Sequence, residues 1–208
     1  MKSKLLILII FALISTTTNA ADYIPVKLID TNGKEQTGYA KRIGANPVKH
    51  VLFKATKNAK KQRIPSDNLK KIIYSYPDAK VEYDRLRMYN RPLSKKPSKK
   101  MYWVKVIKRD YLTIYYVREK AQNHNMNPHL TTRTEGGYWV FYREGEDAAT
   151  IVSLGKVLNG NSVFRFSAQR YFKDYPELAA KIKKKEYKWK DIDEVAELYN
   201  KWYAKKTN

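Results

Sequence analysis

Apolar and polar positions alternate through the first two-thirds of the chain that follows residue 21. In residues 24–30, apolar side chains recur at every second position, which is the period of a half-buried β-strand. Asn32-Gly33 comes next and is typical of a hairpin turn, because both residue types tolerate a positive φ angle. We therefore expect a β-hairpin whose second strand covers residues 36–43.

Further strands are expected where β-branched and aromatic residues gather. They cover residues 50–55, 71–76, 80–89, 102–108, 112–120, 137–143 and 149–154. Arg109-Asp110 forms a short polar turn, so the strands on either side of it should pair as a second hairpin. Ser66-Asp67 suits a single helical turn, and the Asn-rich segment 121–135 is typical of an exposed loop.

After Ser162 the apolar period changes from two residues to about 3.6, which indicates helices. One helix is expected over residues 164–173, a second opens at Pro176, and a third follows a cap at Asp191. The pattern therefore predicts an α+β fold. An antiparallel β-rich body (21–161), barrel-like or sandwich-like, is followed by a helical C-terminal segment (162–208) of two or three helices packed on the body.

The first twenty residues have the form of a secretory signal peptide. Lys2 and Lys4 precede ten apolar residues, and a segment of small and polar residues ends at Ala20. Ten apolar residues are too few for a membrane-spanning helix, which needs about 20. We therefore expect residues 1–20 to be removed by cleavage and the mature protein to be secreted or periplasmic.

The C-terminal segment carries a resemblance to a known group of proteins. The segments concerned are 172–178 (Phe-Lys-Asp-Tyr-Pro-Glu-Leu), 187–192 (Tyr-Lys-Trp-Lys-Asp-Ile), 198–200 (Leu-Tyr-Asn) and Gly38-Tyr39 in the first hairpin. With these segments the chain resembles secreted Bacteroidetes proteins of unknown function. The resemblance implies a signal peptide, a β-rich body and a C-terminal Tyr-Asn helix, and it implies no activity.

Composition is that of a folded protein with a strong positive charge. The 208 residues are 43% hydrophobic, enough for a packed core, and they include no cysteine, which excludes disulfides and Cys-ligated metals. The formal charge is +22, or +20 without the two lysines of the signal peptide. Residues 41–71 and 80–120 each contribute +9 of it. Such a charge favours acidic partners, and in an exported protein these are anionic polysaccharide, lipopolysaccharide or a membrane surface rather than genomic nucleic acid.

Two basic clusters are the candidate anion-binding sites. The first, around a strand-connecting loop, comprises Lys54, Lys57, Lys60, Lys61 and Arg63; the second, in a connector over residues 91–100, comprises Arg91, Lys95, Lys96, Lys99 and Lys100. Aromatic residues close by, Tyr89 and Trp103 among them, suit stacking on bases or on sugar rings. The alternative is that these charges serve only to keep the protein soluble.

No sequence pattern predicts catalysis, a cofactor or a metal. His124 and His129 could ligate a metal together with Glu135, but a spacing of five residues on a loop is not diagnostic. Neither a nucleophile elbow nor a phosphate-binding glycine loop is present. We therefore predict no catalytic residues, no metal ligands and no cofactor.

These observations favour an exported, non-enzymatic protein that acts at the cell envelope by binding or assembly. It would engage anionic polymers or lipid headgroups through its basic loops. The alternative is a secreted carbohydrate-active or other hydrolytic enzyme, which requires a concave pocket that joins two carboxylates, or the loop of His124 and His129 together with an acidic residue. A third hypothesis is a structural subunit whose apolar face pairs with an envelope protein.

Overall fold

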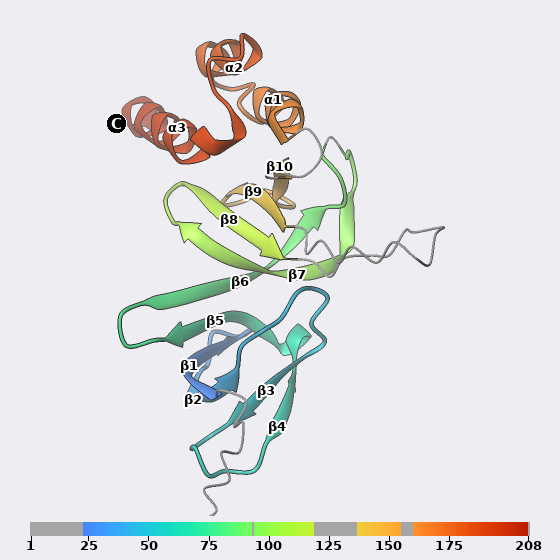
Figure 1. Ribbon diagram of the computed structural model, residues 1–208, viewed down its shortest axis with the longest axis vertical. Coiled ribbons are helices and arrows are strands. Elements are labelled where there is room, and N and C mark those ends of the chain that lie inside the picture. Colours follow the sequence, from blue (N-terminus) through green and yellow to red (C-terminus); the bar gives the residue numbers. More distant parts are fainter. Residues whose placement is uncertain (1–22, 93, 119–136, 155–159, 208) are drawn as a thin grey trace, which may run out of the picture.

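The structure is a computed structural model that describes residues 23–92, 94–118, 137–154 and 160–207. Within these ranges ten strands form one antiparallel sheet in the order β10-β9-β8-β7-β6-β5-β1-β2-β3-β4 (Figure 1). The strands are β1 (Tyr23–Asp30), β2 (Glu35–Lys41), β3 (His50–Lys54), β4 (Gln62–Pro65), β5 (Leu69–Ser75), β6 (Lys80–Tyr89), β7 (Pro97–Lys108), β8 (Leu112–Arg118), β9 (Gly137–Arg143) and β10 (Thr150–Ser153). The helices are α1 (Gly160–Tyr171), α2 (Pro176–Lys183) and α3 (Ile192–Thr207), with short 3-10 turns η1 (Ser66–Asn68) and η2 (Trp189–Asp191).

This architecture confirms the predicted α+β class, and the sheet is open, so the sandwich-like alternative fits. The larger differences from the predictions are three. The sequence pattern predicts no strand at β4, α1 begins at Gly160 rather than at residue 164, and β7 begins at Pro97 rather than at residue 102. The predicted signal peptide and the loop that carries His124 and His129 lie outside the described residues.

The first half of the sheet encloses its own core. The β1–β2 hairpin turns at Asn32-Gly33, where Gly33 has a φ angle of +84°. Because β1 pairs with β5 as well as with β2, the hairpin lies inside the sheet rather than at its edge. The buried side chains of the hairpin pack with those of the neighbouring strands. The buried residues of this first core are Val26, Leu28, Ala40, Ile43, Val51, Phe53, Leu69, Ile72, Tyr74 and Trp103.

The long strands β6 and β7 separate this core from a second one. Val81 of β6 and Trp103 of β7 pack against the first core. Their alternate neighbours, such as Met88 and Val104, pack into a core enclosed by the second half of the sheet. That half curls because Ala149, next to β10, exchanges backbone hydrogen bonds of 2.9 and 3.0 Å with the end of β6. Both faces of β6 and β7 are therefore walls of a core.

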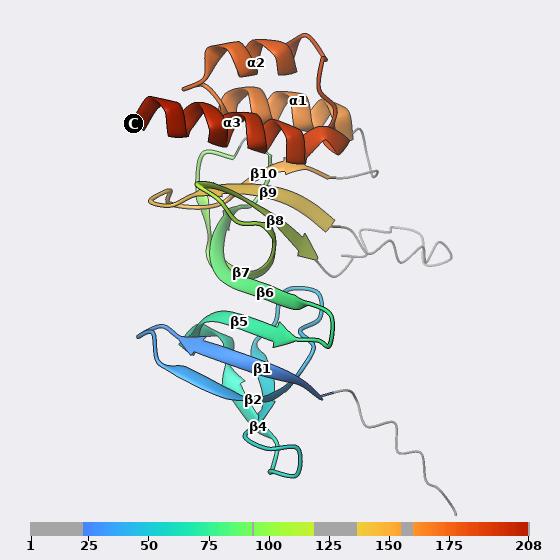
Figure 2. The ribbon, with the colours of Figure 1, turned by 90° about the vertical axis from the view of Figure 1, so that its left-hand side faces the viewer.

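The strands β8, β9 and β10 form a second partition between two cores. On β8, Tyr115 and Val117 face the inner core of the second half, whereas Leu112 and Ile114 face the helices. Figure 2 shows the resulting layers, with the three helices over β8, β9 and β10, then β6 and β7, then the first half. None of the helices in the described ranges is long and apolar enough to cross a membrane.

Gly38 on β2 is a position where the backbone has no room for a side chain. A Cβ atom there would lie 2.5 Å from the Lys54 carbonyl oxygen and 2.5 Å from the Phe53 ring. Gly38→Ala should therefore lower the free energy of unfolding by about 2 kcal/mol, because overpacking a core costs 1–3 kcal/mol. Urea unfolding checks this, with Gly44→Ala as the control. A Cβ at Gly44 meets nothing within 4 Å, and equal losses in both variants would contradict the packing explanation.

Candidate anion-binding site

A large pocket opens where the start of β7 passes the segment before β3 and the η1 turn. Its volume is about 1010 Å³, at the upper end of the range for ligand pockets. We call it the lysine pocket. It is lined by Thr31, Pro47, Val48, Lys49, His50, Pro65, Asp67, Leu69, Lys70, Arg85, Lys99, Lys100 and Met101.

The lysine pocket combines an apolar wall with a cationic rim. Proline and aliphatic side chains form the wall, and five basic side chains face one acidic side chain, a net charge of +4. The four rim lysines are Lys49, Lys70, Lys99 and Lys100, and none of them has an ion pair among the described residues. All four are exposed, so their ammonium groups are available to a ligand.

The fifth base, Arg85, is fixed inside the wall. Its side chain is only 8% exposed, and Nη2 donates a hydrogen bond of 2.6 Å to Asp67 Oδ1. The guanidinium lies over the Trp103 ring, with 5.3 Å from Cζ to the ring centroid. Nε and Nη1 are buried and have no hydrogen-bond partner within the described ranges. The buried Arg85 charge is therefore paired with one exposed carboxylate, that of Asp67. Because the four lysines of the rim are not compensated by a further acid in the lining, the pocket keeps a positive potential.

The structure divides the second predicted cluster between two pockets. Lys99 and Lys100 line the lysine pocket, whereas Arg91 and Lys95 line a pocket beside α1. Lys96 is exposed and lines neither of them. The expectation that the whole connector is a loop is wrong for its last four residues, because they extend β7 and pair with the end of β6.

The first predicted cluster lies elsewhere. It surrounds the loop between β3 and β4, at the end of the molecule opposite the helices (Figure 1). Lys54 lies 4.7 Å from the centroid of the Tyr23 ring, and Lys57 lies 5.8 Å from that of Tyr39. Lys60, Lys61 and Arg63 are exposed, and none of the three lines the lysine pocket. The structure therefore does not bring the two clusters together.

The pocket beside α1 has a volume of about 650 Å³. We call it the serine pocket, because Ser167 of α1 lines it. Its inner wall is an ion-pair network around Arg143, whose Nε lies 2.8 Å from Glu146 Oε1 and whose Nη1 lies 2.7 Å from Asp174 Oδ2. Tyr171 donates its hydroxyl to Glu146 Oε2 at 2.8 Å. This network joins the turn before β10 to the helices, and it uses the two carboxylates fully.

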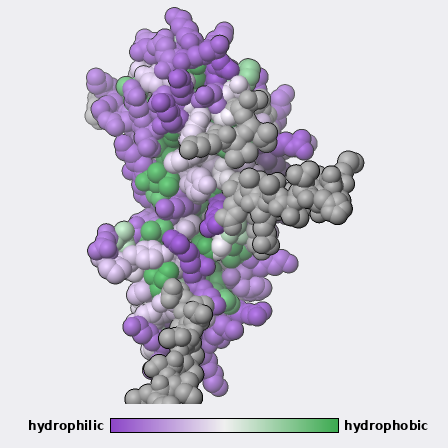
Figure 3. Space-filling model, in the orientation of Figure 1, coloured by the Kyte–Doolittle hydropathy of each residue, from purple (hydrophilic) through white to green (hydrophobic). Residues whose placement is uncertain are grey.

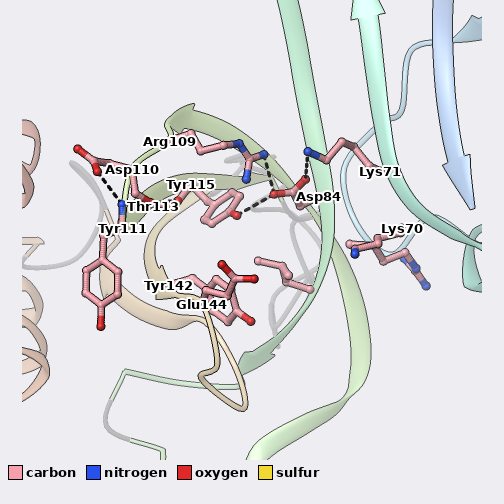
Figure 4. Close-up of a pocket in the computed structure, with 12 residues that line it drawn as sticks. Lys70, Lys71, Asp84, Arg109, Asp110, Tyr111, Thr113, Tyr115, Tyr142 and Glu144 are labelled. Carbon is pink, nitrogen blue, oxygen red and sulfur yellow. Dashed lines mark hydrogen bonds and ion pairs between the residues drawn. The ribbon is translucent and has the colours of Figure 1, made fainter. Parts of the chain in front are cut away.

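A third pocket, of about 600 Å³, surrounds Asp84 of β6 and is called the aspartate pocket (Figure 4). Asp84 Oδ2 accepts hydrogen bonds from Arg109 Nη2 at 2.9 Å and from the Tyr115 hydroxyl at 2.7 Å. Lys71 Nζ lies 3.7 Å from Oδ1. Burial and then the Asp84 charge raise the pKa of Tyr115 well above its usual value. Burial would lower the pKa of Arg109, but the hydrogen bond and charge of Asp84 raise it overall.

Three carboxylates line the aspartate pocket. The hydrolase alternative requires a pocket with two. The three carboxylates belong to Asp84, Asp110 and Glu144. Asp84 is held by two cationic residues and Tyr115, and Asp110 points away from it and accepts a hydrogen bond from the Tyr111 amide at 2.7 Å (Figure 4). Glu144 is the carboxylate of the three with no hydrogen bond to the other residues drawn. Among the described residues no group of three or more His, Asp or Glu side chains could hold a metal ion.

The surface gives little support for an apolar docking face in the part of the chain that is described. Hydrophilic residues cover most of both halves on the face shown in Figure 3, and hydrophobic residues show as small patches near the middle. The large hydrophobic side chains that are exposed are few. Met101 and Ile107 lie six residues apart on β7, Tyr111 lies in the turn between β7 and β8, and Phe166 lies on α1.

The sequence patterns single out neither Arg85 nor Asp84. A signal for them exists, because β6 carries charged residues on both of its alternating faces, and one of these faces also carries Leu86 and Met88. When charged and core-facing apolar residues share one face of a strand, the charged side chains that become buried need ion-pair partners.

Comparisons with known proteins give no match. No protein-family model matches the sequence, and neither a curated protein nor a solved structure is similar to it. The function is therefore inferred from the chemistry of the pockets.

Proposed function

We propose that this protein is exported to the cell envelope and binds an anionic polysaccharide, without catalysing a reaction on it, in the lysine pocket. The observation that supports this most is the rim of four lysines, which have no ion pair with another described residue and lie next to the buried Arg85. Carboxylate or sulfate groups of the ligand would pair with the rim. The aliphatic wall would pack against the apolar faces of the sugar rings. The predicted signal peptide and the charge of +20 that remains after its removal support the envelope address.

A polysaccharide suits this pocket better than a membrane surface does. A bilayer is broad and gently curved, so it is contacted best by cations that protrude from a convex face. In the lysine pocket the cations instead surround a concavity of about 1010 Å³, which a chain of sugars can enter and a bilayer cannot. Membrane binding is therefore kept as an outcome of the test.

The test is a binding titration with heparin as the polyanion probe, for the mature wild type and for Lys99→Gln/Lys100→Gln. We expect the double substitution to raise Kd roughly tenfold, because it removes two charge contacts worth up to about 1 kcal/mol each. The salt dependence of binding should also become shallower, since fewer counterions are displaced.

Matched substitutions separate a site from general charge. Lys183→Gln/Lys184→Gln removes the same charge at the end of α2, and Lys60→Gln/Lys61→Gln removes it from the first cluster. Both should leave Kd within about twofold of the wild type. Equal weakening by all three pairs would mean that net charge alone attracts heparin, which contradicts the assignment.

Two further measurements cover the alternatives. Stronger retention on vesicles that contain lipopolysaccharide than on heparin would favour a membrane partner. The aspartate pocket, with its three carboxylates, supports a hydrolase as the second candidate. Release of new reducing ends from the bound polymer, abolished by Glu144→Gln, would favour that candidate over a binding protein.

A further inference from the structure

We infer that the lysine pocket is one end of a longer track, and that a chain of acidic sugars continues from it into a second anion subsite in the serine pocket beside α1. This inference rests on the proposed function, and it specifies the ligand: a polymer long enough to occupy both pockets, rather than a single acidic sugar.

The serine pocket has the charge of an anion subsite. Arg91 and Lys95 enter it from the connector between β6 and β7, while Arg170 and Lys173 enter it from the end of α1. None of these four has an ion pair with another described residue. With Arg143, the lining has five bases against two acids, a net charge of +3. Arg143 and Glu146 neutralise each other within the network, which leaves four cations facing only one acid, Asp147, a net charge of +3.

Ser167 is the independent sign of a ligand in this pocket. It lies on the wall and is only 2% exposed, and its Oγ has no hydrogen-bond partner in the part of the chain that the structure describes. A buried hydroxyl without a partner is unfavourable and uncommon. In a helix a serine usually satisfies its hydroxyl on a carbonyl of the preceding turn. Here a sulfate or carboxylate oxygen seated between Arg170 and the connector would supply the missing acceptor.

A shallow depression of about 320 Å³ has lining residues in common with both pockets, and with the aspartate pocket through Leu86 and Tyr142. It shares Met101 with the lysine pocket, and it shares Asp147 and Ala148 with the serine pocket. Arg87, which is exposed, lies along it and adds a positive charge between the two ends. The three concavities therefore follow one another along the end of β6 and the start of β7.

The spacing also favours a polymer. Lys95 lines one pocket and Lys99 the other, and four residues of extended chain span at most about 14 Å. A repeating acidic chain can place charged groups at both ends of such a distance. When one end is bound, the other end binds at a high effective concentration, which raises affinity without any new type of contact.

The experiment measures Kd for heparin fragments of increasing length, from the disaccharide to the decasaccharide. A parallel series of oligogalacturonates distinguishes sulfate from carboxylate recognition. For the wild type we expect weak binding of short fragments and a rise of ten- to a hundredfold once the fragment spans both pockets. In Arg170→Gln/Lys173→Gln, short fragments should bind as in the wild type, and the gain with length should disappear.

Ser167→Ala is a second and cleaner probe. Because the hydroxyl has no partner among the described residues, its loss should leave the melting temperature unchanged or slightly higher, while the affinity for long fragments falls. A gain with length that is the same in all variants would overturn the second subsite, since it would arise from the number of equivalent positions on a longer chain. Short fragments that bind with no gain in the wild type would also overturn it and leave the proposed function standing. If neither short nor long fragments bind, the proposed function itself fails.

Discussion

Replacing Asn200 with alanine is expected to lower the free energy of unfolding by about 3 kcal/mol. Asn200 of α3 is 8% exposed, and its side-chain amide bonds to both backbone groups of Leu112 at the start of β8. The Leu112 amide donates to Oδ1 at 2.8 Å, and Nδ2 donates to the Leu112 carbonyl at 3.3 Å. Alanine leaves two buried backbone groups without partners, at a cost of 1–3 kcal/mol each.

Urea unfolding followed by far-UV circular dichroism measures this loss. Lys201→Ala is the matched control, because Lys201 is the next residue of α3 and its side chain is 67% exposed. It should change the unfolding free energy by no more than about 0.5 kcal/mol. If Asn200→Ala were as mild as this control, the amide would not be what anchors α3 to the sheet.

The second large effect is expected at alkaline pH. Burial raises the pKa of Tyr74, Tyr115, Tyr171 and Tyr199 above the value near 10 of an exposed tyrosine, and Asp84, Glu146 and Asp174 add to the rise for the last three. Below pH 10 both states keep these protons, and the stabilisation is complete. Above pH 10 the unfolded chain loses them and the folded protein does not, so stability falls by about 1.4 kcal/mol per tyrosine for each pH unit. Four such groups can exhaust a typical stability of 5–15 kcal/mol before pH 12.

Unfolding free energies measured in urea at pH 9, 10 and 11 should therefore fall steeply above pH 10. Lysines lose charge in the same range, which relieves repulsion and opposes the fall. Tyr115→Phe isolates the tyrosine contribution, because it should reduce the slope by about 1.4 kcal/mol per pH unit. Tyrosinate absorbance at 295 nm that rises fully, with a midpoint near pH 10 and no loss of circular dichroism, would contradict the expectation.

Much of the fold follows from local patterns in the sequence. The Asn32-Gly33 turn, the helix at Pro176 and most strands are where alternation, turn residues and helical period place them. The exceptions have physical causes. β4 is a short edge strand with little burial, so it lacks an apolar pattern. The first four residues of β7 are Pro-Ser-Lys-Lys, which have no strand-like apolar pattern, and they extend the strand through backbone pairing with the end of β6.

The sites were less accessible from sequence. Clustering along the chain predicts ten basic residues as anion-binding, but only Lys99, Lys100, Arg91 and Lys95 of these line the lysine pocket or the serine pocket. The remaining lining residues, such as Lys49, Lys70 and Arg170, come from distant parts of the chain. These residues are brought together by the pairing of the strands and the packing of α1 on the sheet. Spacing along the sequence does not show this arrangement. Tyr199 and Asn200 of the C-terminal helix have structural roles, since the Tyr199 hydroxyl donates a hydrogen bond to Asp174 and the Asn200 side chain accepts one from the Leu112 amide of β8.

The two-sided burial of β6 and β7 has a consequence for how the molecule can come apart. The outline shows two lobes, but each lobe uses these strands as a wall, with Trp103 completing one core and its neighbour Val104 completing the other. Neither lobe has a complete interior by itself. The body should therefore melt as one cooperative unit, and a proteolytic cut in β6 or β7 should dismantle both lobes rather than release either one intact.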